Sequence, residues 1–276
     1  GGFELSLTCK RIIEELNKLA PEQLAEEWDN VGLMIGDMEQ EVSRILIALD
    51  AIPEVIKEAI EGKVDLIITH HPFIFKPIKY IRRDHFLGKS IYELIQNNIA
   101  LYSAHTNLDI AFGGTNDVLA QILELENVEI LSELEVKSRN GEEKYGMGRV
   151  GTVKRKYTLD EFAKFVQNKL KLSNIRIVGD SNHIINKVAL TTGSGMSYLQ
   201  DAVDKKADVF ITGDVKFHDA QRASQLGIAL IDAGHYGTEN IIVPVLKEYL
   251  KKLQEQDHSL EILISKVNGE LFRINI

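Results

Sequence analysis

Residues 64–71 read VDLIITHH, and the same pattern returns as ADVFITGD at residues 207–214. Each copy is an apolar run of strand length that ends in polar residues. A second match follows in the same order, because NIALYSAH at 98–105 resembles GIALIDAGH at 227–235 with one insertion. A spacing above 100 residues is too long for a solenoid repeat. The chain is therefore expected to contain two similar halves, 1–130 and 131–276.

Strand and helix patterns alternate around both copies. In the first half we expect strands at 44–50, 64–69 and 99–104, and helices at 5–25, 52–61 and 90–98. In the second half we expect strands at 187–192, 207–212 and 227–232, and helices at 159–170 and 198–206. This alternation is typical of an α/β fold with parallel strands.

The composition is that of a soluble globular protein, with 44% hydrophobic and 26% charged residues among 276. A single cysteine, Cys9, excludes an internal disulfide framework and a cysteine-rich zinc module. The apolar runs, such as 45–49, are too short to cross a membrane. The net charge of −9 and the lack of a basic run argue against broad nucleic-acid binding. We expect a cytoplasmic protein with no membrane partner.

Histidines and carboxylates gather at the predicted strand ends. Open α/β sheets bind ligands beyond the carboxyl ends of their strands, and imidazole with carboxylate suits divalent Zn, Fe, Mn or Ni. The residues at these ends are His70, His71, His105, Asp109, Asp214, His235 and Glu239. This pattern predicts a metal site.

The adjacent pair His70 and His71 favours two ions over one. Neighbouring side chains of an extended segment point to opposite faces, so each imidazole reaches its own ion more easily. A carboxylate from Asp109 or Glu239 would then bridge the two ions. For His105 two interpretations stay open: it is a metal ligand, or it is a donor that orients Asp109.

Two glycine-rich stretches suggest ligand binding less strongly. GMGRVG at 146–151 fits the dinucleotide pattern G-x-G-x-x-G, but the alternation at 150–157 predicts a strand where that mechanism needs a helix. Gly193 and Gly195 lie between a predicted strand and a predicted helix. They indicate either a tight turn or an anion pocket at a helix N-terminus.

Six motifs resemble those of the NIF-three-like family, whose members are often labelled GTP cyclohydrolase I type 2 homologues. They are EWDNVGL at 27–33, ITHHPF at 68–73, SAHTNLD at 103–109, GMGRVG at 146–151, TGD at 212–214 and GHYGTE at 234–239. The resemblance implies a three-layer α/β protein of two similar halves from an internal duplication. It also implies a metal site between the halves and a toroidal homohexamer.

The resemblance further implies a set of site residues and an activity. The implied ligands of two divalent ions are His70, His71, Asp109, His235 and Glu239. Metal-assisted hydrolysis of a small molecule, either GTP or another nucleotide or a ring amide, would follow, with His105 as general acid or base. The alternative is a metal-binding scaffold or regulatory interaction protein without turnover.

Overall fold

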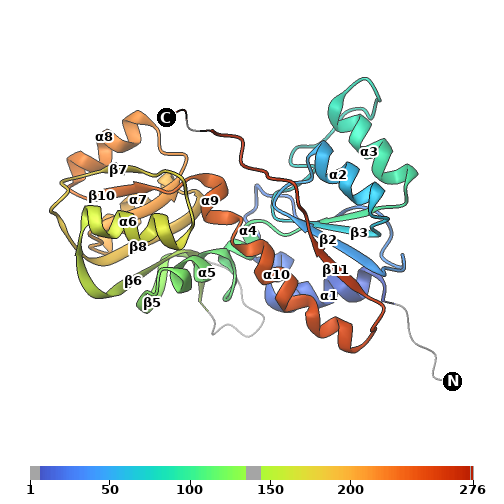
Figure 1. Cartoon of the computed structure of the whole chain (residues 1–276), viewed down its shortest axis with the longest axis horizontal. Helices are drawn as coiled ribbons and strands as arrows, with labels where there is room; N and C mark the ends of the chain where they lie inside the picture. The colour runs from blue at the N-terminus through green and yellow to red at the C-terminus, as the bar shows by residue number, and fades with distance from the viewer. Residues whose placement is uncertain (1–6, 135–143, 274, 276) are drawn as a thin grey trace. The chain divides into compact units, whose positions relative to one another are not determined.

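The computed structural model describes residues 7–134, 144–273 and 275, and these form two compact units (Figure 1). Unit 1 is drawn from residues 1–108 and 242–269, and unit 2 from residues 109–241 and 270–276. These bounds differ from the two halves of the sequence pattern, because residues 242–269 return to the first unit. The division into 1–130 and 131–276 describes the duplicated pattern and stays a prediction.

Unit 1 contains a five-stranded sheet in the order β1-β4-β3-β2-β11. Its strands are β1 (Gly32–Ile35), β2 (Arg44–Ala48), β3 (Leu66–Thr69), β4 (Ala100–Ser103) and β11 (Glu261–Ile264). Only β1 pairs antiparallel with its neighbour. The helices are α1 (Cys9–Leu19), η1 (Glu22–Leu24), α2 (Pro53–Glu61), α3 (Phe86–Gln96), α10 (Ile242–Leu250) and η3 (Lys251–Glu255). A short helix, α4 (Thr106–Ile110), runs across the boundary with unit 2.

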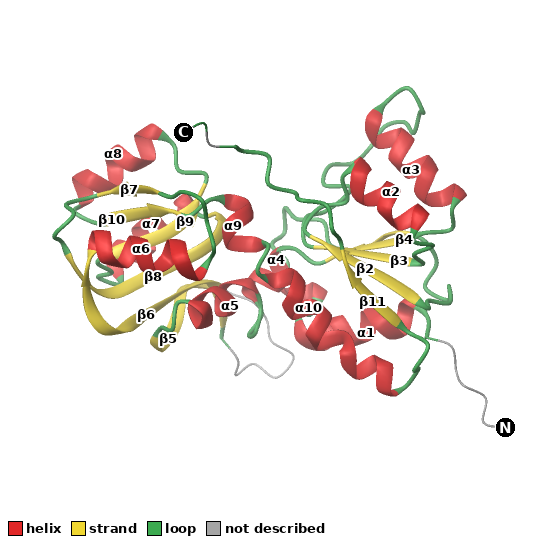
Figure 2. Ribbon diagram, viewed as in Figure 1, coloured by secondary structure: helices red, strands yellow, loops and turns green. Residues whose placement is uncertain are grey.

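Helices cover both faces of this sheet, with α2 and α3 on one side and α1 and α10 on the other (Figure 2). Alternation along each strand explains the arrangement, because successive side chains point to opposite faces. Leu46 and Ile67 pack with Val55 and Ile56 of α2. Ile45, which directly precedes Leu46 in β2 and points to the opposite face of the sheet, is fully buried as well. Unit 1 is therefore a three-layer α/β structure.

Unit 2 repeats this design with a six-stranded sheet in the order β5-β6-β8-β9-β10-β7. Its strands are β5 (Glu126–Leu134), β6 (Tyr145–Thr158), β7 (Arg176–Val178), β8 (Ile184–Ser194), β9 (Val209–Gly213) and β10 (Ala229–Asp232). Its helices are α5 (Thr115–Ile122), α6 (Leu159–Lys169), η2 (Met196–Tyr198), α7 (Leu199–Asp204), α8 (Phe217–Leu226) and α9 (His235–Glu239). One core cluster joins α5 and α6 to the sheet, and another joins α7 and α8 to it.

The two units share a topological core. The order β1-β4-β3-β2 in unit 1 corresponds to β7-β10-β9-β8 in unit 2, and in each the first strand is antiparallel to the second. Local details repeat as well. Asp65 accepts hydrogen bonds, both at 2.9 Å, from the consecutive backbone amides of residues 43 and 44. Asp208 accepts hydrogen bonds at 2.9 and 2.7 Å from the consecutive backbone amides of residues 186 and 187. Lys63 and Lys206 both have positive φ, at 50° and 58°. An internal duplication accounts for these matches.

The α/β fold class is confirmed, and the predicted strands and helices lie within a few residues of those observed. The expected helix at 5–25 is wrong in length: α1 ends at Leu19 and η1 follows, because Pro21 disfavours helical backbone at the residue before it. The G-x-G-x-x-G match lies inside β6, as its strand pattern predicts. Among the described residues, no helix is long and apolar enough to cross a membrane.

Candidate metal centre

In unit 1 the ends of β3 and β4 bring three histidines together. His70 and His71 follow β3 directly, and His105 follows β4. These strands are parallel neighbours, so their carboxyl ends lie at the same edge of the sheet. One ring nitrogen from each histidine lies within 4.8 Å of the other two. Three imidazoles at this spacing form a group that can hold a metal ion. The expectation that His70 and His71 point to opposite faces is wrong, because both residues lie beyond the end of β3 and their ring centroids are 5.3 Å apart.

His70 and His71 are each fixed through Nδ1. Nδ1 of His70 lies 2.8 Å from the backbone oxygen of Ala104, and Nδ1 of His71 lies 2.8 Å from a carboxylate oxygen of Asp50. A carbonyl or carboxylate oxygen accepts hydrogen bonds, so Nδ1 carries the proton in each neutral ring. The lone pair is then on Nε2, the atom that is left available to bind a metal. Histidine ligands in proteins are typically oriented in this way.

His105 is held by a buried carboxylate. Its Nδ1 lies 2.9 Å from Asp29, whose side chain is fully buried and also accepts hydrogen bonds from the amide and hydroxyl of Thr106. Burial alone would raise the pKa of Asp29, but the hydrogen bonds from His105 and Thr106 outweigh it and lower the pKa to about 2. Asp29 is therefore ionised at neutral pH and orients the imidazole. An acid–base residue held by a third group has this arrangement.

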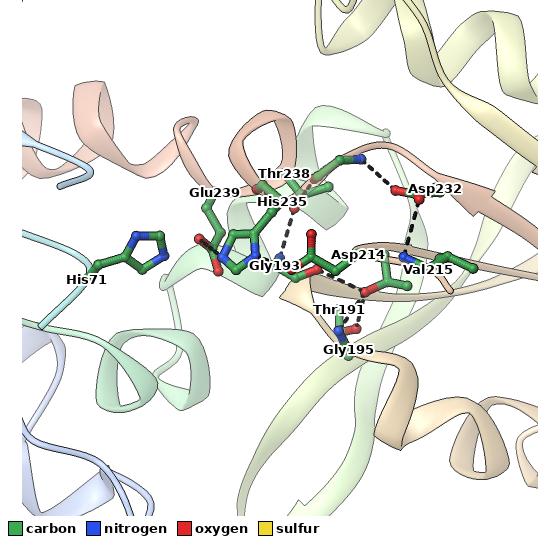
Figure 3. A network of polar contacts seen from close by, with 12 residues as sticks. His71, Thr191, Gly193, Gly195, Asp214, Val215, Asp232, His235, Thr238 and Glu239 are labelled. Carbon is green, nitrogen blue, oxygen red and sulfur yellow. Dashed lines mark hydrogen bonds and ion pairs between the residues drawn. The ribbon is translucent and has the colours of Figure 1, made fainter. Parts of the chain in front are cut away.

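In unit 2, His235 and Glu239 lie one turn apart on α9, which follows β10. Nε2 of His235 lies 3.0 Å from Glu239, and its Nδ1 lies 2.7 Å from Asp214 at the end of β9 (Figure 3). Carboxylate oxygens of Asp109 and Glu239 lie within 4.8 Å of each other, and the Thr115 hydroxyl donates to Asp109. Unit 2 therefore gathers one imidazole and two carboxylates from the predicted ligand set.

Gly193, at the carboxyl end of β8, lies against this group (Figure 3). A Cβ atom there would lie 2.0 Å from Oε1 of Glu239 and 3.3 Å from Nε2 of His235. The backbone has φ +66°, which also favours glycine. A Cβ on Gly195 would collide with Thr191 at 1.6 Å. The two glycines thus form a tight turn that lets the strand end approach Glu239.

These motifs belong to a known family. The model of the family described as Duf34/NIF3 (NGG1p interacting factor 3) matches residues 7–270. The chain belongs to the DUF34/NIF3 family. The resemblance seen in the sequence is thereby confirmed.

Relatives of this DUF34/NIF3 protein match along nearly its whole length. A Clostridium perfringens protein is 40% identical over 256 residues, which are 92% of this chain and 95% of the relative. A Clostridium acetobutylicum protein is 39% identical over 98% of this chain and 99% of its own. Both are named GTP cyclohydrolase 1 type 2 homolog. The structure of a Bacillus cereus protein related to NIF3 matches with a TM-score of 0.90 at 27% identity, over 98% of this chain and 99% of that one.

Sequence reasoning missed two of the three carboxylates that hold the imidazoles of this DUF34/NIF3 protein. Asp50 follows strand β2, so the strand-end rule that selected Asp214 would have found it. Asp29 lies in a turn-rich segment without periodicity, far along the chain from His105, and nothing in its spacing indicates the contact. Only the fold brings Asp29 and His105 together.

Proposed function

We propose that this DUF34/NIF3 protein is a metal-dependent hydrolase with two divalent ions per chain. The ligands that we assign are His70, His71, Asp109, His235 and Glu239. Nitrogen and oxygen donors of this kind suit Zn, Fe, Mn or Ni. Burial, together with Asp37 and Asp65, raises the pKa of the Cys9 thiol to about 11, so a thiolate ligand is not expected.

The proposal rests mainly on one observation. All four imidazoles of the candidate site, His70, His71, His105 and His235, direct Nδ1 at a protein oxygen 2.7–2.9 Å away. Rings oriented in this way leave Nε2 available to a metal ion. Because the rings are already aligned, binding of an ion would restrict their conformation little further. For the three assigned ligands, His70, His71 and His235, this shared orientation is better explained by metal binding than by packing.

Bound divalent ions of this kind supply hydroxide near neutral pH by lowering the pKa of water. The residue that we assign to proton transfer is His105, whose side chain is 18% exposed and whose Nδ1 is anchored by Asp29. With Nδ1 fixed, Nε2 can take a proton from an attacking water or return one to a leaving group. The relatives' name, GTP cyclohydrolase 1 type 2 homolog, supports GTP as substrate. Another nucleotide or a ring amide is proposed on the chemistry of the site alone.

The test is a substrate screen on protein of defined metal content. Chelator-treated protein is reloaded with Zn, Fe, Mn or Ni and offered GTP, other nucleotides, phosphoesters and cyclic amides. We expect turnover only with metal, and a loss of about 100-fold or more in kcat for His105→Ala. The exposed His218 on α8 provides the matched control, His218→Ala, which should retain activity. Turnover that is absent with every metal, or unchanged in His105→Ala, would favour the non-catalytic metal-binding scaffold.

A further inference from the structure

Two exposed aromatic side chains, Trp28 and Phe75, contact each other in unit 1, and Trp28 also lies beside His105. Trp28 is 61% exposed and Phe75 is 44% exposed. Their ring centroids are 6.1 Å apart with planes at 70°, and the indole lies 6.2 Å from the imidazole of His105 at 80°. Large apolar rings left in water next to a candidate catalytic residue are a feature of ligand sites.

The backbone that carries these rings is anchored. Trp28 directly precedes Asp29, whose buried carboxylate binds His105 and Thr106. The side-chain amide of Asn30 donates to the backbone oxygen of Ile74, the residue before Phe75. The two aromatic segments are therefore tied to each other and to the histidine group. Because this backbone is already held in place, binding of a ligand to the two rings would order less of the chain and cost less entropy.

We propose that Trp28 and Phe75 form a subsite for the planar ring of a nucleotide substrate, which stacks on the indole. The inference rests on the proposed function and adds the residues that recognise the substrate. A ring parallel to the indole would meet Phe75 at a similarly steep angle, and edge-to-face contacts of this kind are favourable. Stacking on an aromatic side chain accepts any base, because every base has a π-face.

The charge of the following loop favours a ring that carries phosphate. Residues 76–85, which begin immediately after Phe75 and end where α3 begins, contain four basic side chains and one acidic one, Asp84. The chain as a whole has a net charge of −9, so this loop is a local exception. A positive segment attracts anionic ligands toward the adjacent site. A nucleotide therefore fits the pair better than an uncharged apolar partner would.

Trp28 is the only tryptophan of the chain, so its fluorescence reports on the subsite directly. GMP, guanosine, ribose 5-phosphate and inorganic phosphate are titrated against chelator-treated and metal-loaded protein. We expect quenching by GMP, weaker quenching by guanosine, and none by the two ligands without a ring. Binding of GMP to variants is measured by calorimetry. Trp28→Ala should weaken it by roughly tenfold or more, while Trp28→Phe should retain most of the affinity.

The control is Phe217→Ala, which removes an exposed phenylalanine of unit 2 and should leave GMP affinity unchanged. The inference is overturned if GMP does not quench, if ribose 5-phosphate quenches equally, or if Trp28→Ala binds GMP as tightly as the wild type. A lower mass of Trp28→Ala in light scattering would also overturn it, since a second copy would then cover the pair.

These readouts separate the subsite from the hydrolase proposal. Binding of GMP that depends on Trp28, in protein that turns over no substrate, would support the subsite and count against hydrolysis. Nucleotide turnover with a KM that is unchanged in Trp28→Ala would support hydrolysis and contradict the proposed subsite.

Discussion

At the scale of single residues, three of the candidate imidazoles are each held by a carboxylate. Asp29 holds His105, Asp50 holds His71 and Asp214 holds His235. A carboxylate partner fixes the orientation of the ring and determines which nitrogen carries the proton. Among the three, only Asp29 has a fully buried side chain with further donors around it. Its replacement should therefore have the largest effect.

We predict that Asp29→Asn impairs both stability and turnover. The change keeps the shape but removes the charge that accepts hydrogen bonds from His105 and Thr106, so about 1.5–3 kcal/mol of stability should be lost. The value of kcat should fall while the metal content stays near that of the wild type. Denaturant unfolding, kinetics and elemental analysis measure the three quantities. Asp204→Asn, at an exposed position of α7, is the control. A stable and fully active Asp29→Asn would contradict the assigned role.

At the scale of elements, the end of β8 lies directly against α9. We predict that Gly193→Ala displaces Glu239, because the new Cβ would lie 2.0 Å from its carboxylate oxygen. Gly227→Ala is a close control: its φ of +74° is similar, but nothing lies within 4 Å of the added carbon. Both variants should lose about 1–2 kcal/mol for left-handed backbone. Only Gly193→Ala should also bind metal more weakly, and equal metal affinity of the two variants would refute this assignment.

Glu15 of helix α1 is a buried carboxylate that forms ion pairs with Arg11, Lys18 and Lys252. Burial alone would raise its pKa, but the hydrogen bonds from the three cations lower it to about 2. A depressed pKa stabilises the folded state above the ordinary value of 4.5, and this contribution disappears as the pH falls toward 2. Glu15→Gln should therefore cost about 1–2 kcal/mol at pH 7 and little near pH 2.5.

Unfolding of Glu15→Gln and of the exposed neighbour variant Glu14→Gln at both pH values tests this account. The control variant should unfold like the wild type throughout. If Glu15→Gln lowers the free energy of unfolding equally at pH 7 and pH 2.5, the charge of Glu15 does not stabilise the folded protein.

The repeated strand-to-helix pattern was predictable from the sequence because its signals are local. Apolar runs such as 64–69 mark strands, and Thr158 with Glu161 marks the start of α6, where the capping box is formed. Strand β11 was not predicted, because its position beside β2 depends on pairing between segments about 200 residues apart. The histidine group was predictable from strand ends, whereas the contact of Asp29 with His105 is set by the fold alone.

At the scale of the whole molecule, each unit builds its own sheet and core, and the family relationship extends over residues 7–270. We propose that the chain assembles into the toroidal homohexamer that the sequence resemblance implies. The chain has a mass of 31.0 kDa, so light scattering should give about 186 kDa for six copies. A mass of one chain across the accessible concentration range would contradict this assembly.

We propose that histidines and carboxylates of this chain hold two divalent ions, and elemental analysis tests this proposal most directly. Wild-type protein, His71→Ala, His235→Ala and the control His218→Ala are stripped, reloaded with one metal and freed of excess by gel filtration. We predict about two ions per chain in the wild type and in His218→Ala, and clearly fewer in His71→Ala and His235→Ala. Equal metal content in all four proteins would contradict the account.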